Sequence, residues 1–392
     1  INRSLTGEGN RKTLSLIKKE IKNLKLKSFP SNKKVFDWVI PLEWKINNGF
    51  IITPDKKKIC EFKKNFLHVI SYSQPIKKYL SLSDLKKNLI TLKNKPHSIP
   101  YATTYYRKKW GFCISYNQFK KLKKGKYFVH IDSKHFKGNL DYGELIIPGK
   151  SSKEILLSTY ICHPSLASNE LSGPLVTAFI YNKLKEQKNL KYTYRFIFVP
   201  ETIGSIYSLS IKGEYWKKNL KAGFVVTCIG DDGKFTYKRS RIGNSLPDKI
   251  VETILNQTEN EFNIVDFFPS GSDERQYCSP GFNLPVGSLM RTMYGKYPEY
   301  HTSADNKDYI SFESMEKSIT KYLEVIKLLE KNEKYVNKIP YCEPQLGKRG
   351  LYPTLGSQKE TDKKDFVMAM MWILNLSDGE NDLISISEKS KI

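Results

Sequence analysis

The chain has 392 residues, of which 39% are hydrophobic, 12% aromatic and 27% charged. This length predicts two or three domains with a substantial core, and the composition excludes disordered, collagen-like and membrane-spanning classes of protein. The formal net charge is +25, from 65 Lys and Arg against 40 Asp and Glu, so an anionic partner such as nucleic acid has to be considered.

The first third of the chain carries almost all of the excess positive charge. Residues 1–140 hold 32 basic and 8 acidic side chains. The apolar pattern over 13–26 predicts a helix with a lysine-rich face, and strand-like runs follow at 35–40 and 44–52. Residues 56–140 predict an inserted, mainly β accessory domain. Nine of the 65 cations are Arg, the residue that best matches phosphate, so this charge is more typical of coding bias than of a nucleic-acid surface.

Strands and helices alternate from residue 141 onward. This alternation is typical of an α/β fold with a mixed, largely parallel sheet and helices on both faces. Residues 1–55 and 141–338 together form the predicted catalytic core, and ligands bind such sheets beyond the carboxyl ends of the strands. Strands are predicted at 154–162, 194–199 and 223–229, and helices at 174–185, 203–212, 249–257 and 311–331.

Residues 339–392 form a separate segment with a net charge of −1. A helix over 364–374, a turn at Asp378-Gly379 and a second helix from Leu383 predict a winged-helix-like domain. Phosphate contacts dominate DNA binding, so this charge disfavours nucleic acid as a partner and favours a packing or dimerisation role. A homo-oligomer therefore stays open.

The cysteines and the apolar runs bear on location. Six cysteines are scattered without close pairs, which is typical of reduced thiols. No apolar run approaches the ~20 residues that a membrane span needs. We therefore expect a cytoplasmic protein with no membrane partner.

Metal-binding residue types follow the predicted strands in order. His163 comes directly after one strand, Glu170 lies at the start of the next helix, and Glu201 follows a second strand. Asp273 and His301 lie in later loops of the same region. Each residue alone is explained by a structural role, as a hydrogen-bonded histidine or a helix-capping carboxylate. Because imidazole and carboxylate are normal zinc donors, the whole series predicts a metal site.

This series resembles the zinc-dependent exopeptidases of the aminopeptidase type. In those enzymes a His, an Asp-Asn-x-Ser-Gly segment, a Glu-Glu-x-Gly segment, a Ser-Asp pair and a late His build a two-zinc site. The whole chain is similar to a bacterial aminopeptidase-like family with an inserted β domain and a C-terminal winged helix. The stretches that carry this resemblance are Arg3-Ser4-Leu5-Thr6-Gly7, Phe36-Asp37-Trp38, Pro41-Leu42-Glu43-Trp44, Ile99-Pro100-Tyr101, Trp110-Gly111-Phe112-Cys113, Cys162-His163-Pro164-Ser165, Pro200-Glu201-Thr202-Ile203-Gly204 and Cys342-Glu343-Pro344-Gln345.

The resemblance implies roles for individual residues. His163 and Asp273 would hold one zinc ion, His301 would contribute to the second position, and Glu201 would be the general base. Two positions depart from the family pattern. The bridging Asp of the two-zinc enzymes falls on Asn169, and the carboxylate for the second zinc falls on Thr202. Amide and hydroxyl groups are poor zinc donors beside carboxylate.

We therefore expect one zinc ion rather than two. Its ligands would be His163, Asp273 and His301, with Glu170 able to reach in where Asn169 cannot. Three protein ligands leave an open position for water, whose pKa the metal lowers to about 7. In this mechanism Glu201 accepts the proton of that water as it attacks a carbonyl group.

Together these features favour a zinc-dependent, aminopeptidase-like hydrolase of amide bonds. Its substrate would be a small peptide or another amide, such as a modified sugar. Arg275, Arg291 and Tyr294 lie in or near the same loops and are candidates for binding the substrate, although a structural role explains each of them equally well. Two alternatives stay open: a family member that keeps the fold and has lost catalysis, and a nucleic-acid-associated winged-helix protein.

Overall fold

The computed structural model describes residues 1–351 and 361–392, with the side chains of residues 361–364 left out of the description. The chain divides into two compact units, Ile1–Leu323 and Glu324–Ile392. Among the described residues, no helix combines the length and the apolar character needed to cross a membrane.

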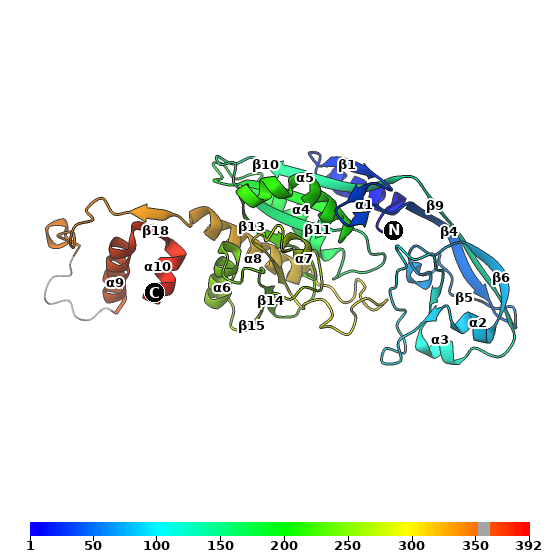
Figure 1. Ribbon diagram of the computed structural model, residues 1–392. Helices are drawn as coiled ribbons and strands as arrows, with labels where there is room; N and C mark the ends of the chain where they lie inside the picture. Colours follow the sequence, from blue (N-terminus) through cyan, green and yellow to red (C-terminus); the bar gives the residue numbers. More distant parts are fainter. Residues whose placement is uncertain (352–360) are drawn as a thin grey trace. The chain divides into compact units, whose positions relative to one another are not determined.

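An eight-stranded mixed sheet forms the centre of the first unit, in the order β1-β10-β12-β11-β13-β16-β14-β15 (Figure 1). In its middle, β11 runs parallel to both β12 and β13, and β13 runs parallel to β16. The pairs β1–β10, β10–β12 and β14–β16 are antiparallel. The predicted mixed, largely parallel sheet is therefore confirmed. Its strands are β1 (Lys25–Pro30), β10 (Asn139–Ile147), β11 (Glu154–Tyr160), β12 (Thr193–Val199), β13 (Leu220–Val225), β14 (Phe235–Lys238), β15 (Phe262–Val265) and β16 (Val286–Met290).

Helices cover both faces of this sheet. Every residue of β11 is buried, and so is every residue of β12 after Thr193, which requires cover on each side. The main core contains aromatic side chains such as Trp216 and Tyr277, which are 1% and 0% exposed. The helices of this region are α1 (Glu8–Glu20), α4 (Ser172–Leu184), α5 (Ile203–Asn219), α6 (Leu246–Thr258), α7 (Glu274–Tyr277) and α8 (Phe312–Lys331).

The first helix differs from the sequence prediction, which placed it over 13–26. Helix α1 begins at Glu8 and ends at Glu20, and residues from Lys25 form the edge strand β1 instead. From Lys25 to Pro30 these residues pair with β10 as a strand. Tertiary pairing thus overrides the helical apolar pattern at residues 25 and 26.

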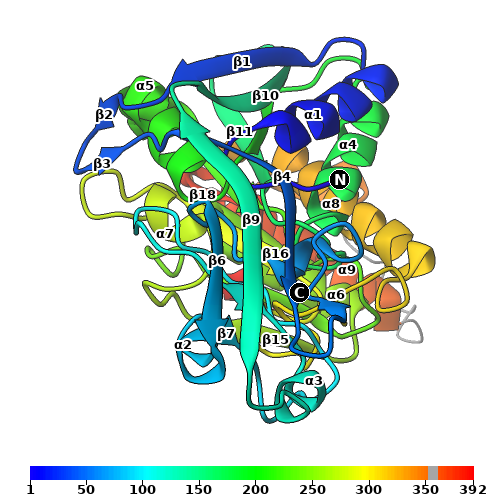
Figure 2. The ribbon, with the colours of Figure 1, turned by 90° about the vertical axis from the view of Figure 1, so that its right-hand side faces the viewer.

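A second sheet forms what we call the four-stranded module, residues 43–136. Its order is β5-β4-β9-β6, and the long strands β4 and β9 lie side by side in Figure 2. Its own core includes Phe112, Ile114 and Val129, each 0% exposed. The predicted limits of the accessory domain, 56 and 140, stay a prediction. The elements are β4 (Glu43–Ile52), β5 (Lys58–Ile59), η1 (Phe66–His68), β6 (Ile76–Ser81), α2 (Leu82–Lys86), β7 (Leu89–Ile90), β8 (Phe112–Cys113), α3 (Tyr116–Lys120) and β9 (Lys126–Phe136), and a small hairpin, β2 (Lys34–Val35) with β3 (Trp38–Val39), precedes them.

The second unit combines helices with a two-stranded sheet. Helix α9 (Thr361–Leu376) leads into β18 (Asp378–Asp382), which pairs antiparallel with β17 (Lys334–Val336), and α10 (Leu383–Ser390) follows. A short 3-10 helix, η2 (Gly347–Arg349), precedes α9 in the chain. The predicted turn at Asp378-Gly379 is instead the start of β18, because Asp378 pairs with Val336 of β17.

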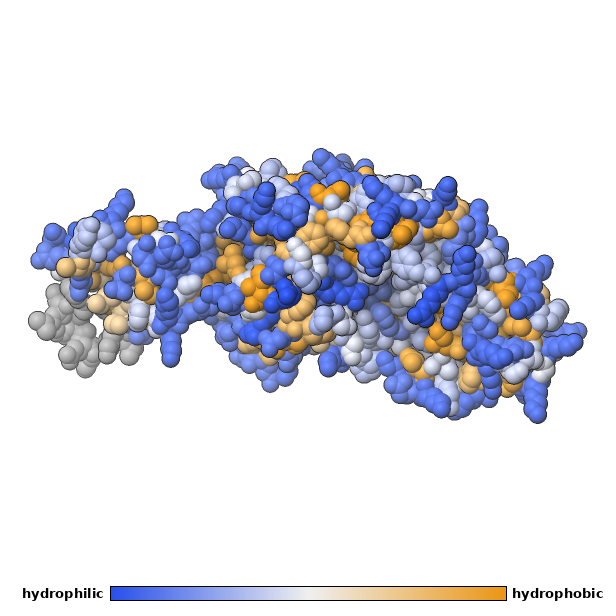
Figure 3. All heavy atoms as spheres, in the orientation of Figure 1, coloured by the Kyte–Doolittle hydropathy of each residue, from blue (hydrophilic) through white to orange (hydrophobic). Residues whose placement is uncertain are grey.

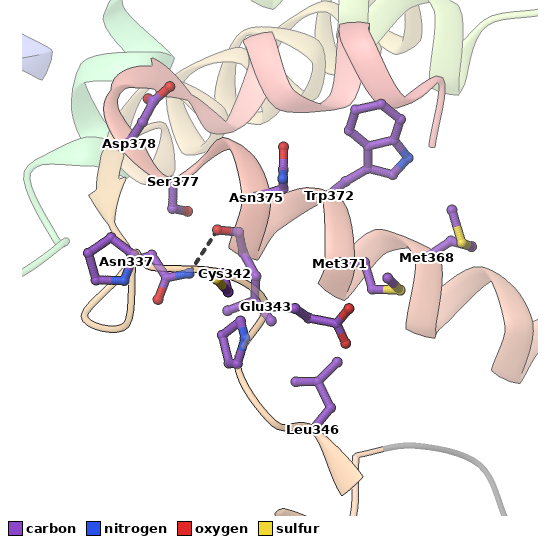
Figure 4. A pocket seen from close by; sticks show the side chains of 13 residues that line it. Asn337, Cys342, Glu343, Leu346, Met368, Met371, Trp372, Asn375, Ser377 and Asp378 are labelled. Carbon is purple, nitrogen blue, oxygen red and sulfur yellow. Dashed lines mark hydrogen bonds between the residues drawn. The ribbon is translucent and has the colours of Figure 1, made fainter.

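A pocket of about 610 Å³ lies within this second unit (Figure 4). Its apolar wall comes from α9, through Met368, Met371 and Trp372. On the other side, the Asn337 amide donates to the carbonyl oxygen of Leu374 at 2.9 Å and ties the preceding segment to the end of α9. The pocket is a feature of this unit by itself.

The exterior reflects the abundance of lysine. Hydrophilic side chains predominate on the face seen in Figure 3, and apolar side chains form small scattered spots between them. This distribution is ordinary for a globular protein.

Candidate metal and catalytic site

The segment after β11 positions His163. The Arg3 guanidinium donates two hydrogen bonds, of 3.0 and 2.7 Å, to the His163 carbonyl oxygen. Glu170 accepts the His163 backbone N–H at 2.6 Å, and its second oxygen lies 2.8 Å from Nδ1 of the ring. Because Nδ1 faces Glu170, the neutral form of the His163 ring carries its proton there and presents Nε2 as the lone-pair atom that can face a ligand.

The corner after β12 brings Glu201 to this histidine. Glu201 Oε2 lies 3.4 Å from His163 Nε2. The corner is tight: Thr202 has φ +65°, and a Cβ on Gly204 would come within 2.7 Å of Val199. The backbone N–H of Glu201 donates to Cys162 Sγ at 3.2 Å. The strained turn therefore fixes where the Glu201 carboxyl group lies.

Asp273 closes the same site from the start of α7. One of its oxygens accepts the backbone N–H of Thr202 at 2.6 Å. The other, Oδ2, is buried and has no hydrogen-bond partner among the described residues. Burial and the nearby Glu201 carboxylate raise the pKa of Asp273 to about 8. An unpartnered buried carboxyl oxygen of this kind calls for a proton or a cation.

His301 completes the group from a later loop. Its ring centroid lies 5.3 Å from that of His163, and its ring stacks on Tyr300 at 3.9 Å. Its φ of +53° marks a strained backbone. Burial lowers the pKa of His301 to about 3, with the His163 charge acting in the same direction. His301 is therefore neutral, which is the form that binds metal.

Tyr101 of the four-stranded module contacts both histidines. Its ring meets those of His163 and His301 edge-on, at 4.8 and 5.2 Å. Its backbone N–H donates to the His301 carbonyl oxygen at 2.8 Å, beside an isolated antiparallel bridge from Pro100 to Thr302. The sequence analysis missed Tyr101 as a site residue, although its aromatic stretch was among the motifs that carried the family resemblance.

The charges of the site leave room for a cation. Burial raises the pKa of Glu201 to about 6, against a lowering by His163 and with a further raising by Glu170. Arg275 lowers the pKa values of Glu201 and Asp273, but burial outweighs it. The site therefore holds more carboxyl groups than cations, and a bound divalent ion would stabilise their charged forms. The buried donor set of imidazole and carboxylate fits zinc.

A second set of possible metal-ligand atoms lies within one short segment of the chain. Potential ligand atoms of Cys162, His163 and Glu170 lie within 4.8 Å of one another. Both Glu170 oxygens are already engaged by His163, and Cys162 Sγ accepts from the backbone of Glu201. Burial, reinforced by Glu170, raises the Cys162 pKa, which disfavours a thiolate. The contacts within this cluster orient the His163 ring, and the role of Glu170 as a metal ligand stays a prediction.

Comparison with known proteins places this site in a family. Residues 1–332 match the family model described as domain of unknown function DUF4910, and residues 333–392 match a winged helix-turn-helix family. The chain belongs to the DUF4910 family. The sequence-based expectation of a C-terminal winged helix is confirmed by the second match.

A protein of Clostridium acetobutylicum is 48% identical to this DUF4910 member over 390 residues, covering 100% of this chain and 88% of that protein. It carries the provisional name polysaccharide biosynthesis protein with aminopeptidase-like domain. A crystal structure from that species, provisionally described as a peptidase, has a TM-score of 0.90 at 46% identity, with the same coverage of 100% and 88%.

The zinc aminopeptidase BSAP from Bacillus subtilis has a TM-score of 0.61 at 13% identity, over 84% of this chain and 90% of that chain. This likeness shows a shared fold. The aminopeptidase-like fold that the sequence indicated is therefore confirmed for the DUF4910 region.

At the two positions of this DUF4910 member that depart from the two-zinc pattern, the side chains form hydrogen bonds with neutral or cationic groups. The Asn169 amide donates to the Tyr160 hydroxyl at 3.2 Å and to Cys228 Sγ at 3.7 Å. The Thr202 hydroxyl accepts from the Arg275 guanidinium at 2.9 Å. Amide and hydroxyl groups are poor zinc donors beside carboxylate, and one zinc ion rather than two stays a prediction.

Asp305 anchors the loop that carries Asn169. Its carboxylate accepts the backbone N–H groups of Ala167, Ser168 and Asn169 at 3.0, 2.6 and 3.1 Å, and the Tyr297 hydroxyl at 3.2 Å. Asp305 lies four residues after His301 but received no role from the sequence. Hydrogen bonds from consecutive backbone N–H groups do not depend on the side chains of the loop, so the sequence pattern does not reveal them.

The three predicted substrate-binding residues have different surroundings. Arg275 lies at the site through Thr202. The Tyr294 hydroxyl donates to Glu274 at 2.6 Å and accepts from the buried Lys238 at 2.9 Å. Arg291 donates to Ser318 Oγ and to carbonyl oxygens of Gly233 and Ser314, over the ring of Phe235. The structure thus brings Arg275, but not Tyr294 or Arg291, to His163 and Glu201.

Proposed function

We propose that this chain is a metal-dependent hydrolase of amide bonds, of the aminopeptidase type. The observation that carries the proposal is the pair of His163 Nε2 and Glu201, 3.4 Å apart, next to Asp273, whose pKa is raised by burial and by the Glu201 carboxylate and one of whose oxygens has no partner among the described residues. The provisional name of the 48% identical relative, with its aminopeptidase-like domain, supports the same class of reaction.

We propose a single zinc ion held by His163, Asp273 and His301. In this arrangement Glu170 fixes the His163 ring by accepting from Nδ1, a common role for a carboxylate next to a metal-binding histidine. The ion would supply Lewis-acid chemistry that polarises a carbonyl group and lowers the pKa of water.

Glu201 is the proposed general base. With a pKa of about 6, its carboxylate is the main form at neutral pH and still a strong enough base to accept a proton from water. The tight corner at Thr202 and Gly204 holds it in place, so little reorganisation accompanies the transfer. Arg275 is the proposed contact for a carbonyl or carboxylate oxygen of the substrate, next to its Thr202 hydrogen bond.

Peptides are the default substrates, and the name of the relative adds another class. Because that protein is named for polysaccharide biosynthesis, amide-bearing sugars belong in the same screen. A cytoplasmic location and an assembly of identical chains remain proposals as well.

The test combines metal analysis with a substrate panel. Elemental analysis of the purified protein should find about one zinc per chain. Amino-acid amides, dipeptides and N-acylated sugars are then assayed with and without a chelator, and we expect hydrolysis of at least one class that the chelator abolishes. A protein that binds zinc but cleaves nothing would favour the alternative of a family member that has lost catalysis. A protein without bound metal, with hydrolysis indifferent to chelation, would overturn the metal assignment.

A further inference from the structure

A second hollow lies in the four-stranded module, away from the carboxyl groups of the metal site. It is a pocket of about 480 Å³. No carboxylate lines it, whereas four cationic side chains and a tryptophan do. The lining residues are Ile70, Lys87, Asn88, Ile90, Thr103, Thr104, Arg107, Lys108, Lys109 and Trp110.

The positive charge of this pocket is largely uncompensated. Lys87 forms an exposed ion pair with Asp84 at 2.8 Å. Arg107, Lys108 and Lys109 have no ion pair or side-chain hydrogen bond with any residue that the structure describes, and all three are exposed. Elsewhere in the module, Glu61 binds two lysines at once. Asp84 thus compensates one of the four cations that line the pocket, and the three consecutive cations remain available for a ligand.

The loop that carries these cations is held by backbone hydrogen bonds. The N–H of Arg107 donates to the Thr104 carbonyl oxygen at 2.6 Å, and that of Lys109 to the Arg107 carbonyl oxygen at 2.8 Å. The Lys109 carbonyl oxygen in turn accepts from Gln74 at 2.9 Å, and Thr104 is tied to Ser71. Three cations on a fixed turn lose less entropy on binding than three on a free loop.

The chemistry of the lining favours phosphate. An arginine fork pairs with two phosphate oxygens, and lysines add point charges beside it. Asn88 and Thr103 offer neutral donors at the same pocket. Trp110 is half-buried, with its ring edge-on to Phe112 at 6.5 Å, so it adds an apolar wall for the part of the ligand next to the phosphate.

The pocket and the metal site share one stretch of chain. Tyr101, which contacts His163 and His301, lies six residues before Arg107. Since a chain advances at most about 3.6 Å per residue, the backbones of Tyr101 and Arg107 are no more than about 22 Å apart. One elongated ligand can therefore reach both places.

We propose that this pocket is an anion-binding subsite for a phosphate or diphosphate group. The binding of an anion here does not depend on the proposed hydrolase function. The further statement that the pocket holds the distal, phosphorylated end of the substrate does rest on that function. The small, concave shape of the pocket and the tryptophan wall favour a small ligand over a nucleic-acid strand.

The test measures the binding of inorganic pyrophosphate to the full-length protein by titration calorimetry. The double variant Arg107→Ala/Lys109→Ala should weaken binding about tenfold or more, because two charged contacts are lost. The matched control is Lys123→Ala/Lys124→Ala, which removes the same charge from exposed positions of the module outside the pocket. This control should bind pyrophosphate within about twofold of the unchanged protein.

Two outcomes would overturn the proposal. Equal weakening by both double variants would show a diffuse effect of net charge, and no weakening by the pocket variant would place the anion elsewhere, for instance at the metal. A sugar phosphate that displaces pyrophosphate would support a phosphorylated carbohydrate, while displacement by an oligonucleotide with a steep salt dependence would instead favour nucleic acid. Because binding is measured directly, a failure of hydrolysis leaves this result interpretable.

Discussion

Glu201 lies beside the imidazole of His163. Its proposed role as general base can be tested with a single substitution. The Glu201→Gln variant keeps the size of the side chain but cannot accept a proton from water. We predict that hydrolysis falls by about 100-fold or more, the usual share of a general base. Rates on the best substrate of the panel and the zinc content of both proteins provide the measurement. Unchanged zinc with an unchanged rate would remove Glu201 from the role of base.

Asp273 should make the metal-free protein sensitive to pH. Its carboxyl group has a folded-state pKa of about 8, far above the ordinary value of about 4, so the folded state binds a proton that the unfolded state releases between these pH values. The free energy of unfolding of chelated protein should therefore fall as the pH rises from about 4 to about 8. Glu201, with a pKa of about 6, adds to the same trend.

The variant Asp273→Asn isolates this effect. An amide oxygen can still accept the Thr202 N–H, but it carries no charge, so chelated variant protein should be more stable at pH 8 by on the order of 4 kcal/mol. Urea unfolding at pH 5 and pH 8 gives the measurement. A difference between the two proteins that is the same at both pH values would contradict the explanation.

At the scale of elements, the loop between β11 and α4 depends on one distant carboxylate. Asp305 accepts three successive backbone N–H groups from residues 167, 168 and 169. We predict that Asp305→Ala lowers the free energy of unfolding by about 3 kcal/mol, because these buried donors lose their acceptor. The control is Asp308→Ala, whose side chain is 78% exposed and pairs with Lys307, and it should change stability by less than about 0.5 kcal/mol. Equal effects in the two variants would show that the anchor is unimportant.

The sequence could predict the elements of the core but not every contact between them. Buried apolar runs form covered strands, so β11 and β12 were predictable to within about two residues, whereas β13 begins three residues and ends four residues before the predicted 223–229. Helix α1 was misplaced because pairing of β1 with β10 is a long-range effect. The carboxyl ends of parallel strands lie at the same edge of such a sheet. His163 and Glu201, which follow two of these strands, could therefore be predicted as neighbours. Tyr101 could not, because its contact with His301 joins segments with no local pattern in common.

At the scale of the whole molecule, the proposed chemistry belongs to the first unit. All residues assigned to the metal site lie between Arg3 and Asp305, and so do the residues to which they are hydrogen-bonded at the site. A chain that ends after residue 332, the limit of the DUF4910 match, should therefore retain its zinc and its hydrolytic rate within about twofold. Metal analysis and the same substrate assay of the shortened protein provide the check. Loss of zinc in a shortened chain that still gives a folded far-ultraviolet spectrum would assign the winged helix a part in the site.

The contact of Tyr101 with His301 also sets an order of events during synthesis. The two residues are two hundred positions apart, and at about 5–20 residues per second the ribosome needs about 10–40 s to pass from one to the other. The four-stranded module can fold early, before His301 has been synthesised and can contact the ring of Tyr101. The site becomes whole late, when most of the chain has been made, so a nascent chain that ends before His301 lacks one of the ligands proposed for the metal.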